Sequence, residues 1–308
     1  MSQTFEMTPR GAFDLAYQQQ HFGGWAPFVP DPAAVAMAFP VEGWETSAVV
    51  VLQQRENGSI SGAVHGCAAD VAQRAWHQAL AVLSLDIDGS GFPAVGERDP
   101  VIGRLQRAHR LMRPTLFHSP YEAACNFVIG QRISIVQARA LRARMAADSG
   151  DRIGVQGMDL AAFPRPQQLL TLTAVRGLAD EKLVRLHGIA RAALDGTLER
   201  RRLRALPVGT ALAELSELRG VGPFSAQGIL FRGAGVVDGV TDDPVTKEAV
   251  QRLYELDHLP DQAAVERLAE VWRPFRTWSQ VLLHVWIRGE GGGPAARAGH
   301  GRPGQRPA

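Results

Sequence analysis

Short alternating runs of apolar and polar residues occupy the first part of the chain, whereas the rest repeats apolar residues at helical spacing. The runs TSAVVVLQQ and ISGAVHGCA flank RENGS, which has Asn57-Gly58 at its tip. Asn-Gly between two such runs predicts a β-hairpin because both residues tolerate positive φ. The following AADVAQRAWHQALAVLSL predicts an amphipathic helix. We therefore predict a small mixed α/β domain over residues 1–88.

The pattern between residues 89 and 288 is helical throughout, with short connections. The segment SPYEAACNFVIGQRISIVQARALRARMAADSG offers Ser119 as an N-cap, Gly130 as a divider and Gly150 as an end. Further amphipathic helices are predicted in PRPQQLLTLT, ADEKLVRLHGIARAALDG, GTALAELSEL, DPVTKEAVQRLYEL, DQAAVERLAEVW and PFRTWSQVLLHVWIR.

Residues 289–308 are rich in Gly, Pro, Arg and Ala without an apolar period, which predicts a disordered basic tail. The expected fold class is α+β: a small antiparallel-sheet domain followed by a mostly helical region.

Composition narrows the class of protein. Of the 308 residues 45% are apolar, which suits a globular protein. Two cysteines cannot form a four-cysteine zinc or iron–sulfur site. The N-terminus lacks the features of a signal peptide, and no apolar run approaches the roughly 18 residues of a membrane helix. We expect a cytoplasmic protein without a membrane partner.

Charge is unevenly distributed along the chain. Residues 1–80 carry three basic and seven acidic side chains, a sum of −4, whereas residues 81–288 carry 27 and 23, a sum of +4. Lys182 and Lys247 are the only lysines. The planar guanidinium group of arginine suits the binding of phosphates. A genome-wide bias toward arginine codons is the alternative explanation of this composition.

A tight, side-chain-poor turn is predicted in LRGVGPFSAQGILFRG. We expect one helix to end at Leu218 and the next to begin at Pro223, with Gly220, Val221 and Gly222 in the turn between them. Backbone amides of this turn and of the new helix's first turn would then be free to bind an anion, which the glycines allow to approach closely. A plain turn is the alternative, but the Leu-x-Gly-Val-Gly-Pro spacing favours a phosphate-binding helix–hairpin–helix.

Two adjacent carboxylates stand before a predicted helix start in TDDPVTKEAV. Asp243 precedes Pro244, so the bland interpretation of Asp243 is a helix N-cap. A catalytic interpretation is compatible with the cap, because a helix N-terminus helps to keep a carboxylate ionised.

These segments resemble the helix–hairpin–helix DNA glycosylases, and within them the DNA-3-methyladenine glycosylase II type. The resemblance rests on LRGVGPFSAQGILFRG, TDDPVTK, YEAACNFVIGQRIS, FPRPQQL, ARAALDGTL and WRPFRTWSQVLLHVW, in the family's order over roughly residues 88–288. It implies a monofunctional hydrolase of base excision repair that flips alkylated purines out of double-stranded DNA and cleaves their N-glycosidic bond. We expect a monomer associated with the nucleoid.

The resemblance assigns the catalytic role to Asp243, which lies four residues before a basic residue, and a supporting role in orienting or capping to Asp242. Cleavage makes the deoxyribose oxocarbenium-like, and a fixed anion stabilises that charge or aligns a water. A cationic alkylated base leaves as a neutral molecule, so one carboxylate suffices. Phe224 stands where strand-cleaving relatives carry a Schiff-base lysine, which implies that the enzyme is monofunctional.

The resemblance also implies a base pocket in which Phe224 and Trp286 present ring faces to the flipped base, with core packing as the alternative for Trp286. Gly228 and Ile287 depart from the family, since tyrosines stand there in its best-known members. Arg132 occupies the position of an apolar wedge that enters the DNA.

No cofactor is expected to be required. The resemblance implies an optional structural Na⁺ or K⁺ on the backbone carbonyls of Ser216, Leu218 and Val221. His284 and the other histidines show no metal-binding spacing, so we interpret them as core or surface residues.

Two other classes of function stay open. One is a non-catalytic DNA-damage-binding protein that keeps the hairpin, against which the intact Asp243 argues. The other is an oxidised-base glycosylase with lyase activity, against which Phe224 argues.

Overall fold

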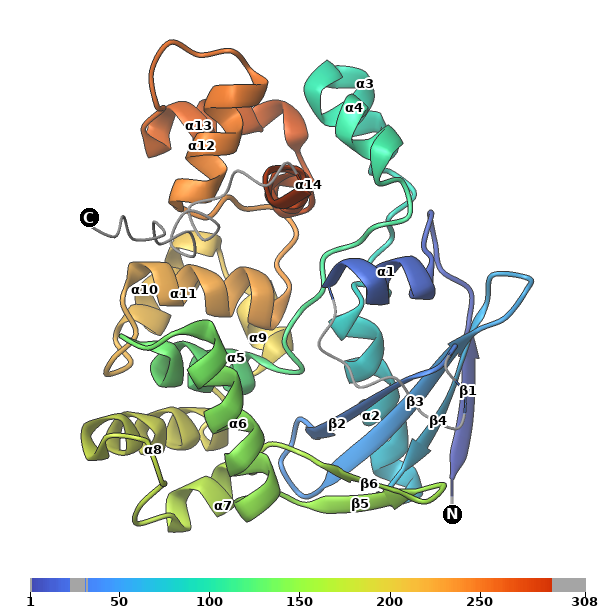
Figure 1. The fold of residues 1–308 in the computed structure, drawn as a ribbon, viewed down its shortest axis with the longest axis vertical. Helices are drawn as coiled ribbons and strands as arrows, with labels where there is room; N and C mark the ends of the chain where they lie inside the picture. The colour runs from blue at the N-terminus through green and yellow to red at the C-terminus, as the bar shows by residue number, and fades with distance from the viewer. Residues whose placement is uncertain (1, 23–30, 32, 290–308) are drawn as a thin grey trace, which may run out of the picture. The chain divides into compact units, whose positions relative to one another are not determined.

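The computed structural model describes residues 2–22, 31 and 33–289, which form two compact units (Figure 1). The first unit comprises Met1–Gly91 and Leu111–Val236, and the second comprises Phe92–Arg110 and Val237–Ala308. The N-terminal sheet shares a unit with helices because Trp44, for example, donates its indole N–H to the carbonyl of Ala193 at 3.0 Å. The predicted boundary at residue 88 stays a prediction. The predicted tail, residues 289–308, lies outside the described residues apart from Gly289.

The N-terminal sheet is antiparallel with strand order β1-β4-β3-β2, which confirms the α+β class. Its strands are β1 (Gln3–Met7), β2 (Val35–Pro40), β3 (Ser47–Gln54) and β4 (Ile60–His65). The predicted hairpin is confirmed, since β3 pairs with β4 around Asn57-Gly58. Only Gly58 of the two tip residues has a positive φ, of 84°.

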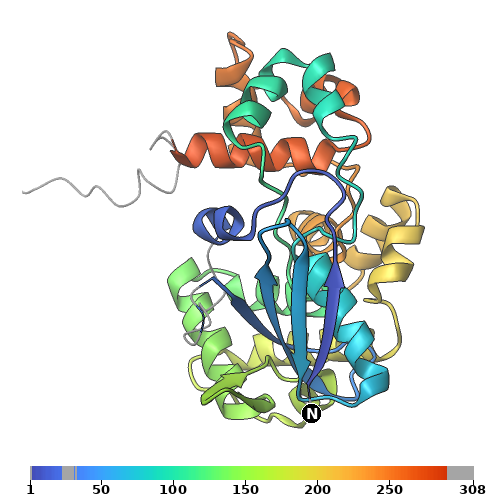
Figure 2. The same ribbon diagram turned by 90° about the vertical axis from the view of Figure 1, so that its right-hand side faces the viewer.

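Helix α2 (Ala69–Val82) covers one face of this sheet (Figure 2). The ring of Trp76 lies against Gly62 of β4, where an added Cβ would come within 2.4 Å of it. Helix α1 (Leu15–Phe22) precedes β2. The predicted helix after the hairpin is therefore confirmed, and its apolar face packs on alternate residues of the strands.

A second, two-stranded sheet interrupts the region that the sequence pattern presents as helical throughout, so that expectation is wrong here. Strands β5 (Arg152–Val155) and β6 (Met158–Ala161) form a hairpin. Its turn residues Gln156 and Gly157 both have positive φ, of 48° and 83°. The segment is too short to bury a helical face, and Val155 instead packs against alanine and valine side chains of β2 and β3.

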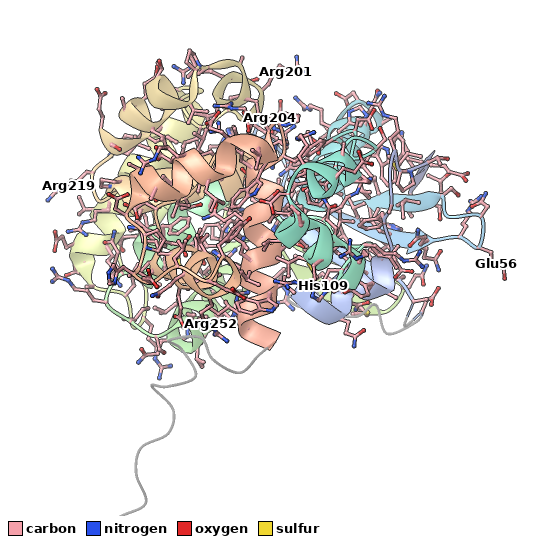
Figure 3. The ribbon with its side chains drawn as sticks, turned by 90° about the horizontal axis from the view of Figure 1, so that it is seen from above. Glu56, His109, Arg201, Arg204, Arg219 and Arg252 are labelled. Atoms are coloured by element: carbon pink, nitrogen blue, oxygen red, sulfur yellow. The ribbon has the colours of Figure 1, made fainter. Side chains whose placement is uncertain are left out.

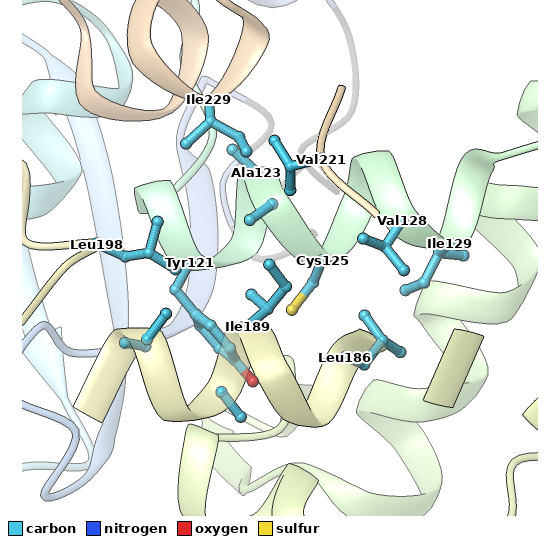
Figure 4. Packing of buried hydrophobic residues seen from close by; sticks show 14 of the residues in the cluster. Tyr121, Ala123, Cys125, Val128, Ile129, Leu186, Ile189, Leu198, Val221 and Ile229 are labelled. Atoms are coloured by element: carbon cyan, nitrogen blue, oxygen red, sulfur yellow. The ribbon is translucent and has the colours of Figure 1, made fainter. Parts of the chain in front are cut away.

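The helical part of the first unit surrounds one buried helix, α5 (Pro120–Gly130). Tyr121, Cys125 and Ile129 of α5 pack against Leu186 and Ile189 (Figure 4). The other helices are α6 (Ile135–Ser149), α7 (Pro166–Thr171), α8 (Asp180–Leu194), α9 (Arg200–Ala205), α10 (Val208–Ser216), α11 (Pro223–Gly228) and the π-helix η1 (Ile229–Ala234).

The predicted helix start and the two predicted helix ends in this region are confirmed. The hydroxyl of Ser119 accepts a hydrogen bond from the backbone amide of Glu122 at 3.1 Å and so caps α5. Helix α5 ends at Gly130, and α6 ends before Gly150.

The second unit is all helical within its described residues. It contains α3 (Pro93–Arg98), α4 (Pro100–Ala108), α12 (Pro244–Leu253), α13 (Gln262–Leu268), the 3₁₀ turn η2 (Ala269–Trp272) and α14 (Arg276–Gly289). The buried carboxylate of Asp99 joins three of these elements. It caps α4 and accepts hydrogen bonds from the Tyr254 hydroxyl at 2.5 Å and the Trp272 indole at 2.7 Å.

Helix α14 packs against α12, so that the start of α12 lies beside the middle of α14. None of the described helices is long and apolar enough to cross a membrane.

Candidate active site

The carboxylate of Asp243 caps the N-terminus of α12, as the N-cap interpretation of the sequence predicts. Asp243 has extended backbone angles, Pro244 follows at the first helical position, and Oδ1 accepts a hydrogen bond from the Thr246 amide at 2.9 Å. Only 6% of the residue is exposed. A carboxylate buried to this degree needs donors for its remaining lone pairs.

Helix α14 and the first turn of α12 supply those donors. Oδ2 of Asp243 accepts hydrogen bonds from the Thr246 hydroxyl at 2.6 Å and from Nε2 of Gln280 at 2.9 Å. Nε2 of His284, one turn after Gln280, lies 3.3 Å from Oδ1. Gln280 is fixed in turn by Thr241, whose amide donates to its Oε1 at 2.9 Å. The orientation of the carboxylate is therefore set from both of its sides.

The protonation of this cluster follows from its geometry. The single proton of the Thr246 hydroxyl goes to the Asp243 carboxylate, the stronger acceptor. Nε2 of His284 then faces two acceptors, Oδ1 of Asp243 and, at 2.9 Å, Oγ1 of Thr246. Nε2 of His284 must carry a proton to contact both favourably.

Burial by itself would raise the pKa of Asp243, because it disfavours the charged form. The hydrogen bonds and charge of His284, and the hydrogen bonds of Thr246, outweigh burial, so the pKa of Asp243 lies below its ordinary value. Asp243 is thus ionised at neutral pH. It presents a fixed negative charge in a site that excludes most water.

Asp242, the predicted supporting acid, has a different environment. Its side chain is 48% exposed, and Oδ1 lies 2.6 Å from Nζ of Lys247. The structure thus brings together Asp242 and the basic residue of α12, and it leaves Asp243 to the polar cluster. The supporting role of Asp242 stays a prediction.

The predicted hairpin lies between α10 and α11, although α10 ends at Ser216 and not at Leu218. Gly220 has a φ of +89°, the left-handed region that favours glycine, whereas Gly222 is extended with a φ of −88°. The amide of Val221 donates to the carbonyl of Leu218 at 2.8 Å and closes the turn. It is therefore not a free donor, contrary to the expectation for the whole turn.

Other amides of the hairpin do remain free. Among the described residues, no hydrogen bond uses the backbone N–H of Gly222, Phe224 or Ser225. Arg219 precedes them in the turn and is exposed, and its side chain points outward in Figure 3. These amides and this guanidinium suit an anion such as a phosphate.

The loop that carries the wedge candidate contacts the hairpin. Arg132 is exposed and has a φ of 56°, which is strained for a residue other than glycine. Its neighbour Gln131 donates a hydrogen bond to the carbonyl of Gly220 at 2.6 Å and accepts one from Arg185 at 2.7 Å. Lys182 donates to the carbonyl of Gln131, also at 2.6 Å. Sequence reasoning missed these contacts, since Lys182 and Arg185 are about 40 residues from the hairpin.

The two predicted base-pocket residues belong to different compact units, so each is described by itself. Phe224, in the first turn of α11, is 56% exposed. Its ring meets that of Phe127 at 6.0 Å and an interplanar angle of 87°. Trp286 of α14 is half-buried, and the guanidinium of Arg252 lies 4.8 Å from its ring centroid.

No family model matches the chain, but comparisons with known proteins find similar sequences and structures. The chain is 26% identical over 209 residues to a DNA-3-methyladenine glycosylase of Bacillus subtilis, covering 66% of this chain and 68% of the relative. It is 29% identical over 193 residues to DNA-3-methyladenine glycosylase 2 of Escherichia coli, covering 60% and 63%.

Solved structures extend the likeness to nearly the whole chain. A 3-methyladenine DNA-glycosylase from Archaeoglobus fulgidus matches with a TM-score of 0.75 and 20% identity over 92% of this chain and 98% of its own. The chain therefore shares the fold of this DNA glycosylase. An 8-oxoguanine glycosylase/lyase from Clostridium acetobutylicum, solved with double-stranded DNA, has the same fold with a TM-score of 0.66 and 15% identity, over 94% and 98% of the chains.

A cation at the hairpin stays a prediction. The carbonyls of Ser216, Leu218 and Val221 lie within the tight turn, and oxygen ligands are those that Na⁺ and K⁺ prefer. The Leu218 carbonyl already accepts the Val221 amide but keeps a second lone pair for a cation. The chemistry of the three donors therefore fits such an ion. The described residues contain no cluster of His, Cys, Asp and Glu side chains suited to a metal.

Thr246, Gln280 and His284 contact the Asp243 carboxylate, and sequence reasoning found none of them as site residues. His284 was expected in the core or at the surface, yet it contacts the candidate catalytic carboxylate. The i, i+4 spacing of Gln280 and His284 on a predicted helix is the one signal available, because it places two polar side chains on one face.

Proposed function

We propose that the protein is a monofunctional DNA glycosylase that flips alkylated purines out of double-stranded DNA and hydrolyses their N-glycosidic bond in base excision repair. The proposal depends on Asp243, a buried carboxylate that is held ionised at a helix N-terminus. The names of the relatives support 3-methyladenine and related bases as the substrate class.

The geometry favours an electrostatic role for Asp243. Its two oxygens are contacted by four donors: the amide and hydroxyl of Thr246, Nε2 of Gln280 and Nε2 of His284. An ionised carboxylate has about four lone-pair sites, so none is left to take a proton from water. Asp243 would act as a fixed counter-charge to the oxocarbenium-like sugar. His284 makes the longest of these contacts and is the donor that a water or the sugar would most easily replace.

The lysines support a monofunctional reaction. Nζ of Lys182 donates to the carbonyls of Ile129 and Gln131, at 2.7 and 2.6 Å, and Nζ of Lys247 pairs with Asp242. The chain holds no other lysine. The family resemblance places Phe224 where strand-cleaving members carry the Schiff-base lysine. A strand-cleaving oxidised-base glycosylase is the second candidate, because an 8-oxoguanine glycosylase/lyase has the same fold.

Double-stranded DNA is the proposed partner, bound by a monomer in the cytoplasm. The free amides at Gly222, Phe224 and Ser225 would hold a backbone phosphate. Because phosphate contacts carry no sequence information, affinity should depend on salt and on the lesion more than on flanking sequence.

Base release from defined duplexes tests the proposal. Oligonucleotides with 3-methyladenine, 7-methylguanine, hypoxanthine or ethenoadenine are incubated with excess enzyme, and the free base is measured by chromatography. We expect release of at least one alkylated purine without strand cleavage. Borohydride trapping on an 8-oxoguanine duplex should yield no covalent complex, and a trapped complex would favour the second candidate. Failure to release any alkylated base while abasic DNA is bound would favour the non-catalytic alternative.

A further inference from the structure

Gly228 is a glycine without a conformational reason to be one. It lies inside the continuous helical run of α11 and η1, with ordinary helical angles of φ −61° and ψ −40°. A Cβ added at Gly228 would lie 2.1 Å from Cζ, 2.5 Å from Cε2 and 2.9 Å from Cε1 of Phe127. All three atoms belong to one ring. The space of a side chain at position 228 is thus taken by the ring of Phe127, from α5.

The Phe127 ring is part of a row of three aromatic rings. It meets Phe117 at a centroid distance of 6.1 Å and Phe224 at 6.0 Å. The row begins against the main helical core, because Phe117 and Phe127 both pack on it, and it ends at Phe224, which is 56% exposed. Phe127 is itself half-buried. The row therefore leads from the core to the surface of the first unit.

Phe127 and Phe224 form a right-angled corner, with an interplanar angle of 87°. A planar ligand stacked on one of the two rings would meet the other ring edge-on. The faces of both rings carry partial negative charge, which attracts a cationic ring more than a neutral one. A purine alkylated on a ring nitrogen has both properties, because it is planar and positively charged.

We propose that Phe127 is a specificity-determining residue that forms, with Phe224, the aromatic corner for the flipped-out cationic base. This inference rests on the proposed function. It assigns to α5 the aromatic wall that the hairpin helix lacks at Gly228. The ring that occupies the space of a side chain at position 228 thus comes from a residue about 100 positions earlier in the chain.

The main test is Phe127→Leu, which keeps apolar volume and removes the ring. Two quantities are measured: the single-turnover release of 7-methylguanine, and the dissociation constant for a tetrahydrofuran abasic-site duplex, whose pocket holds no base. We expect release to slow by about fivefold, the factor that corresponds to about 1 kcal/mol of cation–π attraction. Affinity for the abasic duplex should stay within about twofold of wild type, since only the base contact is lost.

The matched control is Phe5→Leu. Phe5, on strand β1, is also half-buried, and its ring centroid lies 5.7 Å from that of Trp76 in α2. This substitution should change neither quantity. Loss of release by less than twofold in Phe127→Leu would overturn the inference. So would an equal loss of abasic-duplex affinity, because a merely structural role predicts both.

A swap of the ring between positions gives a second test. Gly228→Tyr alone should release 7-methylguanine more slowly than wild type, because the new Cβ would clash with the Phe127 ring. In Phe127→Ala/Gly228→Tyr the new ring gains that space, and 7-methylguanine release should exceed that of Phe127→Ala by at least about threefold if one ring serves the site from either helix. If the double variant releases 7-methylguanine no faster than Phe127→Ala, a ring from the hairpin helix cannot replace that of Phe127. If wild-type enzyme releases no alkylated base, the proposed function fails first and independently of these variants.

Discussion

Gly222→Asp is the sharpest probe of the hairpin, because it should change protein stability and DNA affinity in opposite directions. Gly222 is the N-cap of α11, it lacks a side-chain cap, and its angles of φ −88° and ψ 176° suit any residue. An added Cβ meets nothing within 4 Å. Gly220 is a poorer site, because its φ is +89° and its Cβ would lie 2.6 Å from the Cδ atom of Arg185.

The stability of Gly222→Asp should rise slightly. Aspartate is a preferred N-cap and its charge interacts favourably with a helix N-terminus, which together contribute about 0.3–1 kcal/mol over glycine. The new carboxylate would accept hydrogen bonds from the free amides of Phe224 or Ser225. Those are the amides that we propose for the DNA phosphate.

DNA affinity of the same variant should fall. A carboxylate about 5 Å from a phosphate repels it by roughly 1–3 kcal/mol at an effective dielectric constant between about 20 and 60. We therefore expect the dissociation constant for an abasic-site duplex to rise at least about tenfold, which is 1.4 kcal/mol. Because phosphate contacts position the protein without specifying sequence, the factor should be similar for all flanking sequences.

Gly222→Ala is the matched control, since it adds the Cβ without the charge and should bind within about twofold of wild type. Affinity is measured by fluorescence anisotropy at two salt concentrations, and stability by thermal unfolding. If Gly222→Asp binds abasic DNA as tightly as Gly222→Ala while its melting temperature is native or higher, the hairpin is only a turn.

Three further predictions concern the carboxylates and the C-terminus. Asp243→Asn should keep abasic-DNA binding but lower single-turnover release below a tenth of wild type, and Asp242→Asn should be milder; a lethal Asp242→Asn would show that the roles are exchanged. Thr246→Val removes a donor that lowers the pKa of the Asp243 carboxyl, so the acid limb of the rate–pH profile should move to higher pH; an unmoved limb contradicts the proposed cluster. Deleting residues 290–308, with three arginines and one glutamate, should weaken nonspecific binding slightly by losing counterion release and leave the melting temperature and release rate unchanged; a large fall in melting temperature would refute this.

The pH dependence of stability has a defined sign. The pKa of Asp243 is lower in the folded protein than its ordinary value, so its ionisation stabilises the fold above the unfolded pKa of about 3.9. That contribution is lost as the pH falls through the folded value. In Thr246→Val the folded pKa of Asp243 should lie closer to the unfolded value, so the stabilisation is smaller and is lost at a higher pH. Free energies of unfolding measured by chemical denaturation below about pH 5 would detect this change.

Local signals in the sequence were sufficient for most of the fold. Asn57-Gly58 and the N-cap Ser119 predict their turn and helix start because each interaction is completed within a few residues. The β5–β6 hairpin was missed because its pairing is stabilised by apolar contacts with strands about 100 residues earlier. The strand propensity of the segment itself carries no information about a contact so distant in the sequence.

The candidate site divides in the same way. Asp243 is predictable because its cap geometry depends on Pro244 and Thr246, within three residues. His284, which contributes with Thr246 to keeping it ionised, and Gln280, which helps to orient it, lie about 40 residues later on a helix whose register against α12 only the packed structure supplies. The candidate catalytic carboxylate can thus be predicted from nearby residues, whereas its orientation and part of its pKa shift depend on tertiary packing. Substitutions that shift α14, and with it Gln280 and His284, should therefore slow base release as strongly as changes in α12 itself.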